Sequence, residues 1–265
     1  MWRDHRYRQA LDDLRRGLLA FELWAYLGWH DIRQRYRRSL LGPIWLTLST
    51  AIFVSAIGFL YAKFFGQPVG EFLPFVAIGF IVWILLQTSV TEACVVFVES
   101  ESVIKQIKLP FSVHVSRMLC RNFVIFLHNL LIVPVVLLAT GKSITWSVLV
   151  LPISLLLLAW NCFWIGLVLA TVCARFRDIP PLVGSVMQLV FFLSPVIWLP
   201  AILGNRGWIA TYNPVHHLMD LIRAPVLEGR IPWDSLAVAL AIALAGSAVS
   251  FAVFAHFRHR LAYWI

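Results

Sequence analysis

The stretch ESESVIKQIKLPFSVHVSRMLCRN, residues 99–122, is a long polar interruption between apolar segments and has the pattern of a short amphipathic helix. Pro110 ends that helix, because proline disfavours a helical conformation in the residue before it and has no N–H to donate. A short helix between two membrane spans predicts a docking site for a cytoplasmic partner. The alternative is a polar loop that lies on the lipid headgroups. The apolar face consists of Val103, Ile104 and Ile107, and the polar face of Lys105, Gln106 and Lys108.

The composition on both sides of this stretch is that of a membrane protein. Of the 265 residues, 60% are hydrophobic and 13% are charged, whereas a soluble globular domain has about 25% charged residues. The net charge of +9 does not indicate nucleic-acid binding, because nine of the 22 Lys and Arg residues precede residue 43, beside the first apolar segment. Basic residues in that position are attracted to an anionic membrane surface. The expected partners there are therefore membrane lipids and no nucleic acid.

Six apolar segments predict an all-α integral membrane protein with six transmembrane helices, organised as one domain over residues 1–265. A helix needs about 20 residues to cross a hydrocarbon core of roughly 30 Å. Arg117 and Arg121 stand in the first turns of the third segment and are expected to extend toward the membrane surface. Pro195 is expected to kink the fifth segment. The segments lie near 43–63, 73–98, 113–139, 146–173, 180–199 and 235–257.

Small residues recur at every fourth position in two of these segments. Helix backbones can approach each other closely along such a row, so each row predicts a helix–helix contact. The rows are Gly166, Ala170 and Ala174 in the fourth segment, and Ala237, Ala241 and Ala245 in the sixth.

The distribution of basic residues predicts the orientation of the chain. With the amino terminus in the cytoplasm and six spans, the cytoplasmic side receives 17 Lys and Arg residues and the outer side receives five. We therefore expect a multi-pass membrane protein with both termini in the cytoplasm. The charged amino terminus lacks a short apolar core followed by a cleavage site, so no removable signal peptide is expected. The four scattered cysteines are expected to be free thiols.

Residues 1–42 are expected to lie along the cytoplasmic membrane surface. Apolar residues recur at spacings of three and four from Leu11 through Leu14 and Leu18 to Ala25, which predicts an amphipathic interfacial helix. A basic block follows this helix and precedes the first span. The block consists of Arg33, Arg35, Arg37 and Arg38.

Residues 200–234 form an outer connection that differs from both a span and a plain loop. Asn213 and Pro214 predict the start of a helix, with Asn as the cap and Pro in the first turn. One or two short helices that dip into the outer leaflet are expected, with a structured outer loop as the alternative. The neighbouring residues His216 and His217 do not predict a metal site, because adjacent side chains on a helix diverge by about 100°.

The chain lacks the motifs of an ATP-binding protein or an enzyme. Gly141-Lys142-Ser143 resembles the end of a phosphate-binding loop, but that loop requires a glycine five residues before Gly141, where Val136 stands. The middles of the spans have no charged residue of the kind expected in an ion-coupled transporter. We therefore expect no catalytic residue, metal or cofactor in this chain. Any energy from ATP is therefore expected to come from another chain.

Aromatic residues are abundant, and many stand at the ends of apolar segments, as interface anchors do. Others lie deeper within the segments. Because aromatic faces stack on sugar rings, the deeper residues are candidates for lining a glycan channel, and packing against lipid or the protein core is the alternative. These candidates are Phe80, Trp83, Trp160, Trp164, Phe191 and Phe192.

Several motifs along nearly the whole chain resemble those of ABC-2 type permeases that export polysaccharides, such as O-antigen, capsule and teichoic acid. The chain is most similar in these motifs to the membrane subunit of an O-antigen or capsule exporter. The motifs are RYRRSLLGPIW (35–45), IKQIKLP (104–110), ARFRDI (174–179), SPVIW (194–198), and Asn213-Pro214 followed by Arg223 and Pro225.

This resemblance implies a homodimer of six-span subunits with two ATPase chains docked on the cytoplasmic side. It implies a coupling helix within residues 99–112 and outer gate helices between spans five and six. The cargo in this family is a glycan on a lipid carrier such as undecaprenyl diphosphate. The coupling role is expected of Glu99, Glu101, Val103, Ile104, Lys105, Ile107 and Lys108, and the outer gate role of Asn213, Pro214, His216, His217 and Arg223.

The basic block is then a candidate contact for the diphosphate of the carrier, because arginine forks match phosphate oxygens. The alternative is ordinary anchoring by positive residues. Two other functions stay open: a permease for drugs or small lipids, and a membrane scaffold or enzyme that transports nothing. Neighbouring genes would discriminate among these, since glycosyltransferases and an ATPase with an extra carboxy-terminal β domain favour a glycan.

Overall fold

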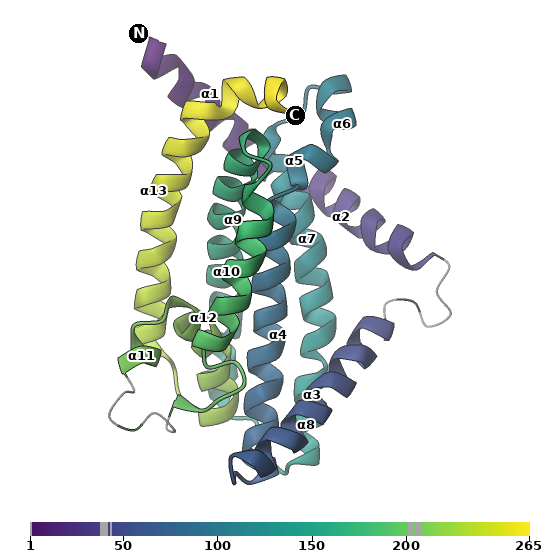
Figure 1. Cartoon of the computed structure of the whole chain (residues 1–265), viewed down its shortest axis with the longest axis vertical. Coiled ribbons are helices and arrows are strands. Elements are labelled where there is room, and N and C mark those ends of the chain that lie inside the picture. Colours follow the sequence, from purple (N-terminus) through teal and green to yellow (C-terminus); the bar gives the residue numbers. More distant parts are fainter. Residues whose placement is uncertain (1, 38–41, 43, 201–203, 205–207) are drawn as a thin grey trace.

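The computed structural model describes residues 2–37, 42, 44–200, 204 and 208–265, and the described part of the chain is helical without strands (Figure 1). Its long helices run along the vertical axis of Figure 1. The helices are α1 (Trp2–Leu19), α2 (Phe21–Tyr36), α3 (Ile44–Phe64), α4 (Val69–Ala93), α5 (Val96–Glu99), α6 (Glu101–Gln106), α7 (Phe111–Leu130), α8 (Ile132–Ala139), the 3₁₀ helix η1 (Trp146–Val150), α9 (Leu151–Arg175), α10 (Ile179–Leu193), α11 (Trp208–Thr211), α12 (Pro214–Arg223), the π-helical turn η3 (Ala224–Glu228) and α13 (Trp233–Trp264).

Within the described ranges, five helical segments are long and apolar enough to cross a membrane. The chain is therefore a multi-pass membrane protein, and five of its six predicted apolar segments are confirmed as long apolar helices. Two of the five are composite, because α8 continues α7 and η1 leads into α9. The five are Ile44–Phe64, Val69–Ala93, Phe111–Ala139, Trp146–Arg175 and Trp233–Trp264.

The segment predicted as the fifth span, residues 180–199, contains the shorter helix α10. Its 15 residues extend about 22 Å at 1.5 Å per residue, which is less than a hydrocarbon core of roughly 30 Å. The predicted kink at Pro195 is wrong, because α10 ends at Leu193, before the proline. Ser194 has an extended conformation with ψ 147°, as expected of a residue that precedes proline.

α4 is the central helix of the bundle and packs against α3, α7, α9, α10 and α12. Phe72, Ile78 and Ile81 on α4 are fully buried, and 67% of its apolar span is buried inside the protein. For α3 the same share is only 17%, and Figure 1 shows α3 inclined away from the other long helices. Because α3 is apolar but hardly covered by its own chain, it faces lipid or another subunit.

The row of small residues in the fourth segment is confirmed as a packing face. Gly166, Ala170 and Ala174 on α9 are all buried. The row predicted for the sixth segment, Ala237, Ala241 and Ala245, is wrong, because these residues are exposed. A different row on α13 packs inward, and Trp164 of α9 covers Gly246 so closely that a Cβ there would lie 2.2 Å from the ring. The buried row consists of Ser235, Ala239, Ala243, Gly246 and Ser250.

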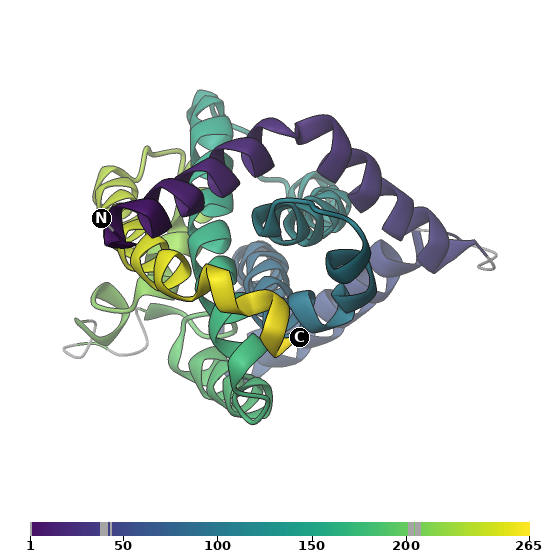
Figure 2. The same cartoon turned by 90° about the horizontal axis from the view of Figure 1, so that it is seen from above.

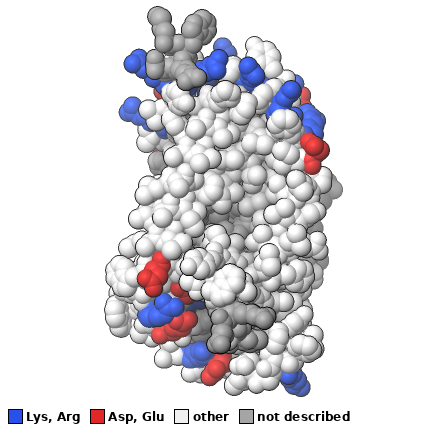
Figure 3. Space-filling view, turned by 60° about the vertical axis from the view of Figure 1, so that its left-hand side comes forward, with Lys and Arg blue, Asp and Glu red and all other residues white. Residues whose placement is uncertain are grey.

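The amino-terminal segment forms two helices that pass over one end of the bundle (Figure 2). α1 packs on α7 and α13, and α2 packs on α7. Both chain termini and α6 lie at this end, while α11 and α12 lie toward the opposite end (Figure 1). Lys and Arg side chains gather at the same end in Figure 3, and a broad band without charged residues separates them from the charges at the other end. Such a band is the surface expected to face the apolar part of a membrane.

Candidate functional site

α6 lies at the end of the molecule that holds both termini (Figure 1). The predicted short helix is present over Glu101–Gln106. Lys105 donates a 2.6 Å hydrogen bond to Glu101, and this bond lowers the pKa of the Glu101 carboxyl. The Glu101 carboxyl is therefore ionised at neutral pH. One detail of the predicted helix is wrong: Ile107 lies beyond its end in an extended conformation and is 54% exposed, so it does not continue the apolar face.

The residues with a predicted coupling role form a largely accessible surface around α6. Ile104 is only partly accessible, because its side chain packs against the hydrophobic core. The exposed residues are Glu99, Lys105, Ile107 and Lys108, and the partly exposed ones are Glu101, Val103 and Ile104.

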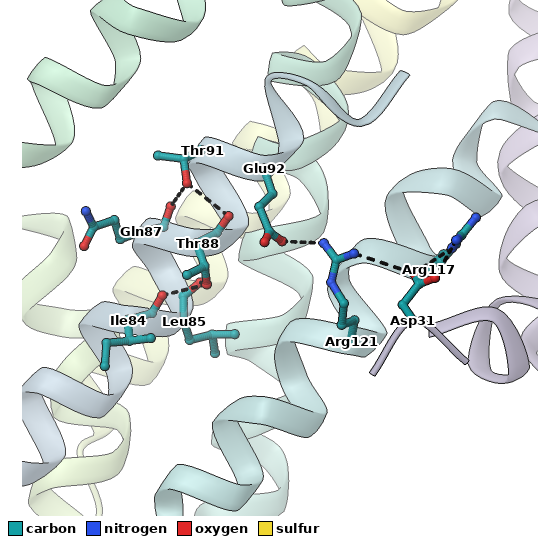
Figure 4. A network of polar contacts seen from close by, with 9 residues as sticks. All are labelled: Asp31, Ile84, Leu85, Gln87, Thr88, Thr91, Glu92, Arg117 and Arg121. Carbon is teal, nitrogen blue, oxygen red and sulfur yellow. Dashed lines mark hydrogen bonds and ion pairs between the residues drawn. The ribbon is translucent and has the colours of Figure 1, made fainter. Parts of the chain in front are cut away.

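Behind α6, a network of ion pairs connects α2, α7 and α4 (Figure 4). Arg117 on α7 donates two hydrogen bonds, of 2.8 and 2.5 Å, to the carboxylate of Asp31 on α2. Arg121 lies 3.6 Å from the same carboxylate and donates a 2.7 Å hydrogen bond to Glu92 on α4. These carboxylates hold the two arginines, which are partly exposed, between helices. Paired, partly buried charges of this kind fix the relative positions of the helices that carry them.

A polar cavity of about 230 Å³ lies between this network and the coupling segment. Glu99, Ser100 and Val103 line it on one side, and His114 of α7 lines it together with the ion-paired residues. The network therefore borders the segment around α6 and the transmembrane bundle at once.

α2 approaches α7 closely at Gly28, one turn before Asp31. A Cβ at position 28 would lie 3.0 Å from the carbonyl oxygen of Arg117 and 3.2 Å from the Cβ of Cys120. A larger residue would push α2 away from α7, so Gly28 permits the separation at which Asp31 reaches both arginines.

The basic block lies at the carboxyl end of α2, immediately before α3. Arg33, Arg35 and Arg37 are exposed in the structure, whereas Arg38 lies outside the described residues. Exposed arginines at this position are accessible to an anionic ligand or to lipid headgroups.

The six deeper aromatic residues do not form one surface. Phe80 of α4 stacks on Phe53 of α3. Trp83 of α4 contacts Phe191 of α10, which in turn contacts Phe192. These four candidates therefore lie where α4 meets α3 or α10. The remaining two lie on α9. Trp160 donates a hydrogen bond to Ser247 of α13, and Trp164 donates one to Asn161. These two belong to the packing between α9 and α13.

The predicted outer gate region includes α11, α12 and η3, and residues 201–203 and 205–207 of it lie outside the described residues. Asn213 caps α12 as predicted, since its side-chain oxygen accepts a hydrogen bond from the N–H of Val215. Its amide nitrogen also donates to the carbonyl oxygen of Leu193 at the end of α10. α12 packs against α4, α9 and α13, and every residue from His217 to Arg223 is buried. The helix is thus embedded among other helices of the bundle.

The two neighbouring histidines of α12 have different environments. Burial lowers the pKa of His216. His217 has both ring nitrogens engaged, one 3.0 Å from the hydroxyl of Ser235 and the other 2.7 Å from the carbonyl oxygen of Thr211. Ser235 also donates a 2.8 Å hydrogen bond to Asp220. His217 therefore joins α12 to α11 and to the start of α13.

The sequence alone did not indicate that the carboxylates of Asp13 on α1 and Asp31 on α2 hold these helices on the bundle. On α1 the predicted apolar stripe is largely turned outward, with Leu11 60% and Leu18 49% exposed, as suits an interfacial helix. The face that packs on the bundle consists instead of Ala10, Asp13 and Gly17, which are buried. The one signal for this face in the sequence is the helical spacing of two small residues around an acid.

Comparison with known proteins agrees with this architecture. A sequence profile of the ABC-2 type transporter family matches residues 22–227. The O-antigen export system permease protein RfbA of Myxococcus xanthus is 25% identical over 232 residues, which cover 84% of this chain and 89% of that protein. A protein of the same name from Klebsiella pneumoniae is 21% identical over 251 residues, which cover 91% of this chain and 94% of the relative. The profile matches well over half of the length of this chain, and the chain therefore belongs to the ABC-2 type transporter family.

Proposed function

We propose that this chain is the permease subunit of an ATP-driven exporter that moves a lipid-linked polysaccharide, of the O-antigen or capsule type, across the bacterial inner membrane. The observation that carries the proposal is the similarity to permeases named for O-antigen export, which extends over 84% and 91% of the chain. The bundle of long apolar helices, with polar elements gathered at its two ends, is consistent with a membrane conduit.

An ATPase subunit, in two copies, docks on the end of the permease that presents α6 and holds both termini. ATP and Mg²⁺ bind to that partner. Support comes from the exposed side chains of Lys105, Ile107 and Lys108 around α6, which combine charge with an apolar contact. The ion pairs behind α6 connect this surface to α2, α4 and α7. This end accordingly faces the cytoplasm.

The working unit is a homodimer in which the second copy covers α3 and α10. Both helices pack against α4 and leave most of their apolar surface uncovered. Met187 alone is buried among the 15 residues of α10, and four of the 21 residues of α3 are buried. A second copy would remove this surface from lipid and enclose a path between the subunits.

The glycan passes along the side of α4 that faces α3 and α10. Phe80, Trp83, Phe191 and Phe192 supply aromatic faces for sugar contact there. The exposed Arg33, Arg35 and Arg37 at the carboxyl end of α2, with Arg38, hold the diphosphate of the undecaprenyl carrier through charge-assisted hydrogen bonds.

The region from α11 through η3 serves as the outer gate, at the end of the bundle away from α6 (Figure 1). Asn213 and Pro214 start α12. His216 and His217 lie in its first turn, and Arg223 is its last residue. Because α12 also contacts α4, α9 and α13, a shift of those helices changes its position.

Deletion of the gene tests the proposal. The expected result is loss of surface polysaccharide together with accumulation of the lipid-linked polymer on the cytoplasmic side, and restoration of both by the wild-type gene. A deletion strain with normal surface polysaccharide would contradict the proposed cargo. Export of a drug or a small lipid that is lost in the same strain would then support the broader permease function.

A further inference from the structure

The carboxylate of Asp13 on α1 is fully buried and joins three helices that are distant in the chain. Its Oδ2 accepts a 3.1 Å hydrogen bond from the N–H of Phe111 and a 2.8 Å hydrogen bond from Nε of Arg258. Its Oδ1 accepts from the N–H of Ser112 at 3.1 Å and lies 2.9 Å from the Ser112 hydroxyl. The side chain of Asp13 has an exposed fraction of 0%, and that of Arg258 27%. Asp13 therefore bridges α1, the first turn of α7 and the last turns of α13.

The contact with α7 is a helix cap supplied by another helix. The first N–H groups of any α-helix lack partners within it, and a negative charge near them is favourable. The residue that precedes α7 is Pro110, which supplies no side-chain cap. Asp13 takes over this role from 98 residues away in the sequence.

The packing at this contact is as restrictive as the hydrogen bonds. A Cβ at position 17, one turn after Asp13, would lie 2.0 Å from the Ser112 hydroxyl oxygen. Glycine thus allows α1 to lie against the start of α7, and the Ser112 hydroxyl also donates to the main-chain oxygen of Asp13 at 2.9 Å. α1 and the start of α7 can therefore move apart only if several buried hydrogen bonds break together.

The capped turn lies directly after the coupling segment. Only residues 107–110 separate the end of α6 from Phe111, so a displacement of α6 acts first on this turn. We propose that Asp13 is a positioning residue for energy coupling, which makes the start of α7, α1 and the carboxyl end of α13 move as one unit when the ATPase displaces the segment around α6. This inference rests on the proposed function of the chain as a permease driven by a separate ATPase.

The Asp13→Asn variant removes the charge and keeps the size of the side chain. In either orientation the amide N–H₂ group would face at least one of the N–H groups that donate to the carboxylate, and Arg258 would lose its counter-charge. Loss of one partner from a buried hydrogen-bonded pair is more disruptive than loss of a solvent-exposed pair. Asp12 is the matched control, because it is the adjacent acid on the same helix and its ion pair with Arg16 is exposed, at 53% and 73% of the two side chains.

The test uses the full permease reconstituted with its ATPase in liposomes, with a fluorescent undecaprenyl-diphosphate oligosaccharide as the probe. The measured quantity is the number of probe molecules moved per ATP hydrolysed. We expect Asp13→Asn to lower this ratio about tenfold while the ATPase still co-purifies, and Asp12→Asn to keep the wild-type ratio. The Arg258→Gln variant is expected to lower the ratio as well, and the double variant to be no worse than Asp13→Asn alone, because both act through one contact.

A second measurement is independent of the cargo, and the milder Ser112→Ala variant keeps it decisive if Asp13→Asn loses its fold. It records the rate at which a single cysteine at position 263, near the end of α13, reacts with a maleimide with and without ATP, in a variant whose four native cysteines are replaced. We expect an ATP-dependent change in the wild-type background and none in Asp13→Asn or in the milder Ser112→Ala. An unchanged transport ratio in Asp13→Asn, or an ATP response at position 263 that survives both substitutions, would overturn the inference.

The two proposals fail in different ways. If the wild-type complex moves no probe but shows an ATP response at position 263 that Asp13→Asn and Ser112→Ala abolish, the proposed cargo is wrong and the role of Asp13 stands. If the wild-type complex moves the probe and Asp13→Asn moves it with the same ratio, the role of Asp13 is wrong and the proposed function stands.

Discussion

The guanidinium of Arg223, at the end of α12, lies 3.7 Å from the centroid of the Phe75 ring on α4. The same group donates hydrogen bonds to three main-chain carbonyl oxygens, those of Pro195, Val196 and Phe75. Arg223 is 4% exposed, and among the described residues no carboxylate lies within ion-pair distance of it. A buried cation is thus held by backbone dipoles and an aromatic face, and it fastens α12 to α4 and to the chain that follows α10.

Replacement of Arg223 by Lys is expected to destabilise the protein by roughly 2–3 kcal/mol, because one ammonium cannot reproduce the planar fork and the stacking. Gly79→Ala is expected to act in the same direction, since a Cβ there would lie 1.8 Å from Nη2 of Arg223. Thermal unfolding of the purified protein measures both. Arg230→Lys is the control, because Arg230 is 53% exposed, and a loss there equal to that of Arg223→Lys would contradict this explanation.

Removal of the Asp31 charge is expected to loosen α2 from the bundle. Asp31→Asn leaves Arg117 and Arg121 without their shared carboxylate, and we expect a loss of about 1–3 kcal/mol, below the range for fully buried pairs because the arginines are partly exposed. The exposed pair between Asp12 and Arg16 supplies the control, Asp12→Asn, with an expected loss of less than about 1 kcal/mol. Chemical denaturation in detergent, compared between the two variants, checks the difference.

Charge reversal at Lys105 together with Lys108 is expected to reduce co-purification of the ATPase at least tenfold without loss of membrane insertion. In this variant a carboxylate at position 105 replaces the ammonium group that lowers the pKa of Glu101, so two acidic side chains one helical turn apart repel each other. The stability of the native Lys105–Glu101 pair is present at neutral pH and is lost as the pH falls through that lowered pKa. Export is expected to be lost in this variant, and also in Ile104→Pro, which breaks the helix. The matched control is Lys142→Glu, on the connection after α8, and wild-type export by the Lys105/Lys108 variant would exclude the coupling role.

The two histidines of α12 are expected to respond differently to alanine substitution. His217→Ala leaves the buried hydroxyl of Ser235 and the carbonyl of Thr211 short of one partner each, and we expect a loss of about 1–3 kcal/mol. Nδ1 of His216 has no hydrogen-bond partner among the described residues, so His216→Ala is expected to cost less than His217→Ala. Melting temperatures of the two variants, measured side by side, decide this, and equal losses would show that burial alone determines the effect.

The proposed homodimer predicts where cysteines will cross-link. In a variant without native cysteines, a pair at Ile52 of α3 and Leu189 of α10 is expected to give covalent dimers in membranes, because these exposed side chains lie on the surface assigned to the second copy. A single cysteine at Leu156 of α9, which is also exposed, is the control and is expected to stay monomeric. Dimers from the control with none from the pair would place the interface elsewhere.

The sequence by itself determined the class of the protein and the positions of its long helices. Runs of about 20 apolar residues have few stable arrangements other than a helix in a membrane, because every backbone polar group must be bonded within the segment. The same local logic located α6 through Pro110 and located the start of α12 through Asn213 and Pro214, whose capping bond is present. These features depend on neighbours in the chain, so they can be read without knowledge of the fold.

Only the tertiary structure decided which polar residues meet. The sequence gives no means of pairing Asp13 with Arg258, which is 245 residues away, or Asp31 with Arg117, because the partner of a charge depends on how helices pack. The same reason explains why the predicted row of alanines on α13 is exposed and why the apolar stripe of α1 faces outward. The spacing and type of residues define a helix face but do not determine which element packs on it. The segment at 99–122 shows both sides: its helix was evident from the sequence, and its connections to α1, α2, α4 and α13 came from packing.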